Sequence, residues 1–238
     1  KLDVVKKFVK RVASLEEKEC FDLNGQRRVK NIIDILWMFG TYNQIFYRAD
    51  RDFFHRVFQP TQILFFDKLN KDFCKDSPKQ ELSSLATILG KFPSQEFRFP
   101  YINKAVEAIC ETINNDESFF STESFFYVRD TKHSLKILCE DAAKNAAKIA
   151  GLIAKLPVAE RRKPAMIKVS ERIAALIQDH DMSVFFRDSY TKGHHAALIA
   201  HMFSVMKIED CYDVSVKLLQ GLSESSYFSK DEKTTRSL

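Results

Sequence analysis

Apolar residues recur every three or four positions through most of the chain, which is the spacing of helices that bury one face. Residues 80–113 show this most clearly, with one apolar stripe before a polar stretch and another after it. Pro93 cannot continue a helix, so we predict that the first helix ends near Phe92. Pro100 suits the first turn of a second helix. The unit is therefore predicted to be a helical hairpin with a loop of about six or seven residues.

This hairpin pattern occurs twice, because residues 144–177 match residues 80–113 without a gap. Similar apolar spacing alone could arise by chance between any two helices. Both prolines, an arginine and a lysine also keep their places, and chance does not explain that. The matched positions include Leu85 with Ile149, Ala86 with Ala150, Leu89 with Ile153, Lys91 with Lys155, Pro93 with Pro157, Arg98 with Arg162, Pro100 with Pro164, Lys104 with Lys168 and Ile109 with Ile173.

Two looser copies flank this pair, near residues 29–60 and 195–220. A single hairpin cannot bury its own apolar face, whereas stacked hairpins cover one another. We therefore predict an all-α fold, an α-solenoid of stacked helical hairpins. A small residue that would let a neighbouring helix approach closely keeps its place in all four copies: Gly40, Gly90, Ala154 and Ser204.

The predicted organisation is one helical repeat domain over residues 1–222, followed by a polar tail over residues 223–238. Residues 1–20 form a basic amphipathic helix that either caps the stack or belongs to a preceding repeat. Phe-rich links precede three of the units, and we expect their aromatic side chains to fill the core between hairpins. The hairpin units are predicted near residues 29–60, 80–113, 144–177 and 195–220, and the links read "ILFFDKLNKDF", "FFYVRDTKH" and "FFRDSYTKGH".

Composition agrees with long helices and a reducing compartment. The 238 residues include only six Gly and six Pro, which are few turn-formers for an all-β protein. The five cysteines are widely separated in the sequence, which argues against a disulfide framework. No apolar run approaches the roughly 20 residues that a membrane span needs, so no membrane partner is expected.

Positive charge is concentrated in parts of the chain. The net charge is +5, and residues 1–60 and 121–180 each contribute +4 while the rest is slightly acidic. Such an excess is typical of a surface that meets polyanions, or of a solvated face with a chance bias. Stacking would align repeat-equivalent cations into ladders that follow a phosphate backbone. The predicted RNA-binding residues are Arg27, Arg28, Lys30, Arg48, Arg98, Lys104, Arg161, Arg162, Lys163 and Lys168.

The alternative for the arginines near the hairpin loops is structural, because they can bind carbonyls at helix C-termini within a repeat. No catalytic, cofactor or metal constellation is recognisable, so we predict neither an enzyme nor a cofactor. His194, His195 and His201 cluster in the sequence, but no two of them have the i, i+4 spacing of a helical zinc site. We expect the first two near a helix start and the third on a helix flank.

Three segments, "IIDILWMFGTYN", "LSSLATILGKF" and "AALIAHMFSVM", resemble the first helix of the octotricopeptide and heptatricopeptide class of helical repeats. The resemblance extends over about residues 29–220, and it implies a right-handed superhelix of the armadillo, HEAT or tricopeptide type. It implies a non-catalytic protein that binds single-stranded RNA in organelle transcript processing, editing or translation, with a mitochondrial location and no small-molecule substrate. Armadillo and HEAT scaffolds share the pattern. The alternating charge along the chain, the modest net charge and the Phe-rich links favour an alternative, a protein-binding subunit of a large ribonucleoprotein or assembly complex.

Overall fold

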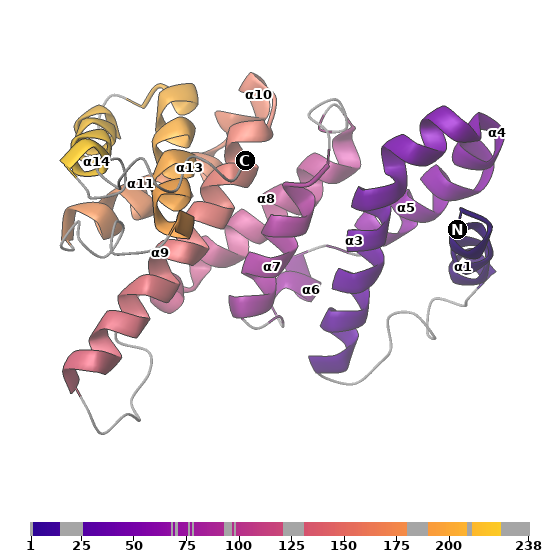
Figure 1. Cartoon of the computed structure of the whole chain (residues 1–238), viewed down its shortest axis with the longest axis horizontal. Coiled ribbons are helices and arrows are strands. Elements are labelled where there is room, and N and C mark those ends of the chain that lie inside the picture. Colours follow the sequence, from indigo (N-terminus) through magenta and orange to yellow (C-terminus); the bar gives the residue numbers. More distant parts are fainter. Residues whose placement is uncertain are drawn as a thin grey trace, which may run out of the picture. The chain divides into compact units, whose positions relative to one another are not determined.

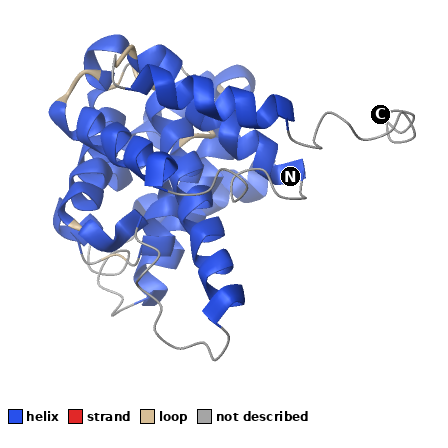
Figure 2. Ribbon diagram, turned by 90° about the vertical axis from the view of Figure 1, so that its left-hand side faces the viewer, coloured by secondary structure: helices blue, strands red, loops and turns tan. Residues whose placement is uncertain are grey.

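The computed structural model describes residues 2–14, 26–67, 69, 71–75, 77, 79–92, 97, 99–120, 131–179, 190–208 and 211–224. Helices are the only regular secondary structure in these ranges, and Figure 2 draws no strand among them. The prediction of an all-α protein is therefore confirmed for the described part of the chain.

The chain divides into two compact units, Lys1–Thr112 and Ile113–Leu238. The single repeat domain predicted over residues 1–222, and its right-handed superhelix, stay predictions. In the first unit the helices are, in chain order, α1 (Leu2–Ser14), α3 (Gln26–Ala49), α4 (Arg51–Phe53), the π-helix η1 (Phe54–Phe58), α5 (Gln59–Asp67), α6 (Lys71–Lys75), α7 (Lys79–Leu89) and α8 (Pro100–Asn115), whose end belongs to the second unit (Figure 1). The second unit continues with the 3-10 helix η3 (Glu117–Phe120), α9 (Thr131–Lys155), α10 (Val158–Arg161), α11 (Pro164–Asp179), α13 (Tyr190–Met206) and α14 (Tyr212–Glu224).

The two close sequence copies share their second helices and the turns around the loop, whereas their first helices differ in length: α7 has 11 residues and α9 has 25. Helices α8 and α11 are each 16 residues long, and each begins at the proline that the repeat predicts. The turns on either side of the loop also match at the level of individual backbone hydrogen bonds. The equivalent donor and acceptor pairs are Phe92 N–H to Leu89 O (3.0 Å) and Leu156 N–H to Ile153 O (3.1 Å), Ile102 N–H to Phe99 O (3.2 Å) and Met166 N–H to Lys163 O (3.0 Å), and Asn103 N–H to Phe99 O (3.5 Å) and Ile167 N–H to Lys163 O (3.2 Å).

Burial follows the same register in both copies. Positions that the apolar stripes assign to the core are buried in each hairpin, while the equivalent lysines Lys104 and Lys168 are exposed. This is the arrangement expected when each helix buries one face and leaves the opposite face to solvent. The buried pairs include Leu85 with Ile149, Ala86 with Ala150, Leu89 with Ile153, Ile102 with Met166, Ile109 with Ile173 and Ile113 with Ile177.

Small residues do allow close packing between helices. A Cβ atom at Gly40 in α3 would lie 3.1 Å from Cε2 of Phe92, so α3 closely approaches the turn that ends α7. In the second unit, a Cβ atom at Gly151 in α9 would lie 3.3 Å from Cδ2 of Leu198 in α13. At Gly90 the nearest atoms belong to the residue's own turn. The close approach of a neighbouring helix is therefore seen at Gly40, as predicted, and at Gly151, which the repeat pattern did not single out.

The first unit has an aromatic core on which α1 packs. Phe58 lies between Phe39 and Phe46, with ring centroids 5.1 Å and 5.2 Å away. Phe65 and Phe66 of the first Phe-rich link are buried, which confirms that these side chains fill the core. Helix α1 buries valines against η1 and α5, so the amphipathic helix predicted at the N-terminus packs on this unit.

Pro60 explains the π-helix in this unit. It is the second residue of α5 and lies two positions after Phe58, the last residue of η1. Proline has no N–H to donate, and its ring would clash with the carbonyl one turn earlier. A wider π turn in front of it relieves that clash without ending the helix. Asp50 starts the segment, because its carboxylate accepts a hydrogen bond from the Phe53 N–H at 3.0 Å as an N-cap.

An arginine closes the end of α8 in the second unit. Arg172 of α11 donates hydrogen bonds to the carbonyl oxygens of Ile113, Asp116 and Glu117. The last four carbonyls of a helix have no partner within it, so the guanidinium supplies one from a neighbouring helix. This is the structural role that the sequence offered as an alternative for the loop arginines, but at a position which the sequence did not select. Of the other two Phe-rich links, residues 125–130 and 185–189 lie outside the described residues, as do residues 225–238 of the predicted tail. The rest of these segments is helical, residues 131–133 in α9, residues 190–194 in α13 and residues 223–224 in α14.

Candidate nucleic-acid interface

The predicted RNA-binding residues fall into three groups. Four lie where no side chain is described: Arg27, Arg28 and Lys30 at the start of α3, and Arg98 in the first hairpin loop. Three are exposed on separate helices: Arg48 on α3, Lys104 on α8 and Lys168 on α11. The remaining three, Arg161, Arg162 and Lys163, lie in the second hairpin loop.

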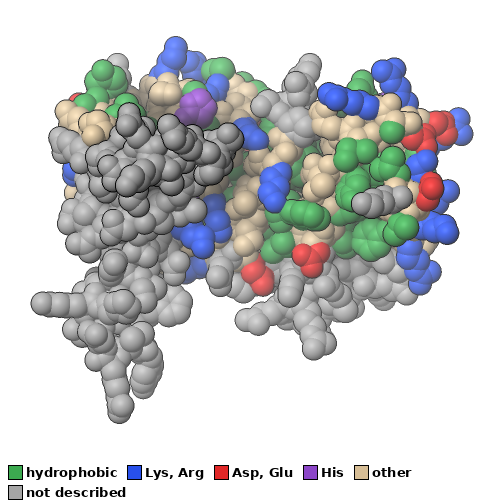
Figure 3. All heavy atoms as spheres, viewed as in Figure 1, with side chains coloured by type: hydrophobic (Ala, Val, Ile, Leu, Met, Phe, Trp, Pro, Cys, Tyr) green, Lys and Arg blue, Asp and Glu red, His purple; other side chains and the backbone are tan. Residues whose placement is uncertain are grey.

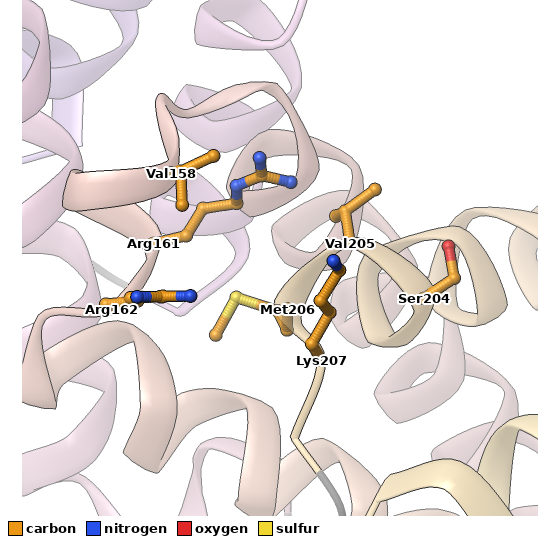
Figure 4. Close-up of a pocket in the computed structure, with 7 residues that line it drawn as sticks. All are labelled: Val158, Arg161, Arg162, Ser204, Val205, Met206 and Lys207. Atoms are coloured by element: carbon orange, nitrogen blue, oxygen red, sulfur yellow. The ribbon is translucent and has the colours of Figure 1, made fainter.

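Arg161 and Arg162 line a pocket together with a lysine from another helix. The pocket has a volume of about 260 Å³ and lies between α10 and the C-terminal end of α13. In Figure 4 the side chains of Arg161, Arg162 and Lys207 extend toward one region, with Met206 between them. The other lining residues are Val158, Ser204 and Val205. The described site therefore combines three cationic side chains with an apolar floor.

Local structure positions each of these cations. Pro157 precedes α10, a helix of one turn, and Arg162 ends it with φ −84° and ψ 0°. Helix α13 ends at Met206, and Lys207 takes the left-handed conformation with φ 53°. Its N–H donates to the Phe203 carbonyl at 3.2 Å, as in an αL C-cap. Glycine usually occupies such a position, so a lysine there has a conformational cost of about 1 kcal/mol.

The charges at the pocket are only partly compensated. Nε of Arg161 is buried and has no hydrogen-bond partner in the described structure. Lys163, by contrast, forms an ion pair with Glu160 at 2.8 Å and does not line the pocket. The end of α13 brings the negative end of its dipole near the cations, which favours their positions but adds no full charge. A bound anion would therefore complete the site.

Cations at equivalent positions of the two close copies do not all have the same surroundings. Lys91 is exposed, and its ammonium lies 5.4 Å from the centroid of the Trp37 ring. Its equivalent Lys155 is half-buried, and burial lowers the pKa of its ammonium. The arginine pair cannot be compared, because Arg98 lies outside the described residues. Alignment of these cations along one face stays a prediction.

Lys207 is the pocket residue that the sequence reasoning missed. It lies three positions after Ser204, the small residue of the fourth copy. The same offset leads from Gly90 to Pro93 and from Ala154 to Pro157, which mark the ends of the first helices. In the first of the four copies, however, the same offset leads from Gly40 to Asn43, inside α3, so the repeat register was only a partial signal that Lys207 stands at a helix end.

The three histidines that cluster in the sequence lie along α13 (Tyr190–Met206). His194 and His201 are exposed on α13, and His195 is half-buried on the same helix. Among the residues that the structure describes, no group of three or more His, Cys, Asp or Glu side chains could hold a metal ion.

No described helix is both long enough and apolar enough to cross a membrane. Comparisons with protein-family models, with curated proteins and with solved structures found no match for this chain. The resemblance to tricopeptide-type repeats therefore stays a prediction, and the pocket carries the functional argument.

Proposed function

We propose that this chain is a non-catalytic helical-repeat protein that binds single-stranded RNA, and that its hairpins stack as a solenoid. The observation that supports this best is the pocket formed by Arg161, Arg162 and Lys207. In line with the resemblance of its first helices, we propose a role in organelle, specifically mitochondrial, transcript processing, editing or translation.

The chemistry of the pocket suits a phosphodiester. Arginine offers a planar fork of donors that matches phosphate oxygens, and lysine adds a compact charge. The buried Nε of Arg161 gains a partner when an anion enters. The apolar floor of Val158, Val205 and Met206 suits the edge of a sugar or a base. If three cations each neutralise one phosphate of a single strand, the slope of the logarithm of the binding constant against the logarithm of the salt concentration is about −2.

The test is binding of a fluorescein-labelled oligouridylate, measured by anisotropy at several salt concentrations. Reversing both arginines, Arg161→Glu with Arg162→Glu, should weaken binding at least about tenfold and reduce the salt slope by about 1.4. A matched control reverses two exposed lysines away from the pocket, Lys144→Glu with Lys217→Glu. This control variant has the same net charge as the double arginine variant. It therefore separates binding at the pocket from general electrostatic attraction of RNA to the whole chain. Equal affinities for the two double variants, or no binding by the unaltered chain, would contradict the proposal.

A protein-binding scaffold is the second proposed function, and one surface favours it. Tyr212 and Leu219 on α14 are 70% and 55% exposed, and their spacing of seven residues puts them on one helix face. Exposed apolar residues on one face are typical of protein contacts. Leu219→Glu should then remove partners that co-purify after nuclease treatment, while oligouridylate binding stays unchanged. Partners that remain after this change would contradict the scaffold role of α14.

A further inference from the structure

One face of α3 presents an aromatic ring, an aliphatic side chain and a cation to solvent. Trp37 is 46% exposed and Ile45 is 42% exposed, and Arg48 is exposed one turn further on. Their spacing of eight and three residues puts all three on one side of the helix. Figure 3 shows hydrophobic side chains exposed over the region of α3, with basic side chains at its border. We call Trp37, Ile45 and Arg48, together with Lys91, the α3 surface.

The Trp37 ring is held by the packing of the first unit. Gly40 of α3 lies so close to Phe92 that a Cβ atom added to the glycine would be 3.1 Å from the edge of the ring. This close packing fixes α3 against the end of α7. Lys91 lies two residues after the end of α7, and this approach brings its ammonium over the Trp37 ring, 5.4 Å from the centroid. The indole is thus exposed and preorganised, with a cation over one face of the ring. These are the properties of a platform for a nucleobase.

We propose that the α3 surface binds single-stranded RNA, with an unpaired base stacked on Trp37 and neighbouring phosphates at Lys91 and Arg48. The proposal rests on the RNA-binding function proposed above, but it concerns a different site, in the first unit rather than at the pocket. An aromatic platform flanked by cations is the general arrangement by which proteins hold single strands without reading their sequence.

Charge favours RNA over a protein partner on this surface. Lys91 lies at the Trp37 end, and Arg48 lies 11 positions along α3 from Trp37, about 16 Å along the helix axis. Cations therefore bound the apolar stretch on both sides, whereas the core of a protein contact is usually depleted of charge. Asp34 is exposed one turn before Trp37 and would repel a phosphate. The strand is therefore expected to run from Trp37 toward Arg48.

The chain offers a direct reporter for this site, because Trp37 is its only tryptophan. Titration with unlabelled oligouridylate should quench the Trp37 fluorescence along the same curve that anisotropy gives for binding. Trp37→Leu should weaken binding roughly tenfold, and Trp37→Phe should weaken it less because the ring can still stack. Lys91→Gln should lower affinity and reduce the salt slope by about 0.7. Phe8→Leu on α1 removes an aromatic side chain that is 46% exposed, as Trp37 is, and serves as the matched control.

The outcomes separate the two proposals. If the unaltered chain binds RNA without quenching of Trp37, and Trp37→Leu binds as well as it does, the α3 surface is not an RNA site while the proposed function stands. If the unaltered chain does not bind RNA, both proposals fail. If Trp37→Leu instead loses a protein partner and keeps its RNA affinity, the α3 surface binds protein and our inference is wrong. Far-UV circular dichroism of each variant verifies that it is folded.

Discussion

Replacing Arg172 by methionine should destabilise the second unit strongly. The guanidinium donates from Nη1 to the Ile113 carbonyl, and from Nη2 to the carbonyls of Asp116 at 2.8 Å and Glu117 at 3.1 Å. It also lies 5.3 Å from the centroid of the Phe120 ring. Methionine keeps an unbranched apolar stem of similar reach but cannot donate. In the variant the Ile113 and Asp116 carbonyls therefore keep only their backbone bonds, from Asp116 N–H at 3.2 Å and Phe119 N–H at 3.0 Å.

The size of this effect follows from the contacts. The bonds to Ile113 and Asp116 are partly buried, and a hydrogen bond from a charged donor contributes about 1.5 kcal/mol or more. The bond to Glu117 is exposed to solvent and is counted as zero. The cation–π contact adds about 0.5 kcal/mol. Burial lowers the pKa of Arg172, which shows that desolvation offsets part of the gain. We expect a net loss of about 3 kcal/mol in the free energy of unfolding.

Urea unfolding followed by far-UV circular dichroism measures this loss. A change of about 3 kcal/mol should lower the midpoint by about 1–2 M. Arg172→Lys keeps the positive charge but loses the planar pair of guanidinium donors, so the loss in free energy of unfolding should be about half as large. Lys168→Met on the same helix removes an exposed cation and should change stability by less than about 0.5 kcal/mol. If Arg172→Met and Lys168→Met unfold at the same urea concentration, the capping role of Arg172 is refuted.

Three further predictions concern packing, pH and thiol reactivity. Gly40→Leu should cost about 1–3 kcal/mol of stability in urea unfolding, because Phe92 leaves no room for a larger side chain, and an unchanged midpoint would contradict the close approach. The Asp50 carboxylate accepts a hydrogen bond from the Lys6 ammonium at 2.6 Å, and this bond lowers the pKa of the Asp50 carboxyl. The ion pair therefore stabilises the folded chain at pH values above the usual pKa of an aspartate. This stabilisation is lost as the pH falls through the lowered pKa. Asp50→Asn keeps the N-cap acceptor but removes the charge. Its melting temperature should be lower than that of the unaltered chain at neutral pH and equal to it in strong acid. A difference that persists in strong acid would argue against the ion pair. Burial raises the pKa of the Cys74 thiol to about 12, so iodoacetamide at pH 8 should label it only after denaturation, as read by peptide mass spectrometry, and rapid native labelling would disagree with its burial.

The helices of the two close copies were predictable because local physics dictates them. A proline that can start but not continue a helix stands at the same place in each copy, and α8 and α11 begin there. The core positions followed from the 3.6-residue period, since only one face of each helix can be buried. The π turn before Pro60 was not predicted, because a proline near a helix start can either begin a new helix or widen the existing one.

The pocket was only half predictable, for a reason that lies in tertiary structure. Arg161 and Arg162 stood out as a charge cluster in a loop. Nothing local indicated that α13 would end beside them, or that a non-glycine residue, Lys207, would take a left-handed conformation there. Arg172 was missed for the same reason, because its acceptors lie more than 50 residues away in the chain.

Comparison of the copies argues against a code in which each repeat reads one base in the same way. The residue equivalent to Arg161 in the first copy is Phe97, which is fully buried. The residue equivalent to Lys163 is Phe99, and the residue equivalent to Lys155 is Lys91, whose surroundings differ. The helix starts at Pro100 and Pro164 and the pattern of buried positions are thus common to the copies, whereas the groups able to bind an anion are specific to each one. Recognition would then rest on unlike sites, a cationic pocket in one unit and an aromatic platform in the other, and removal of one should lower affinity without abolishing it.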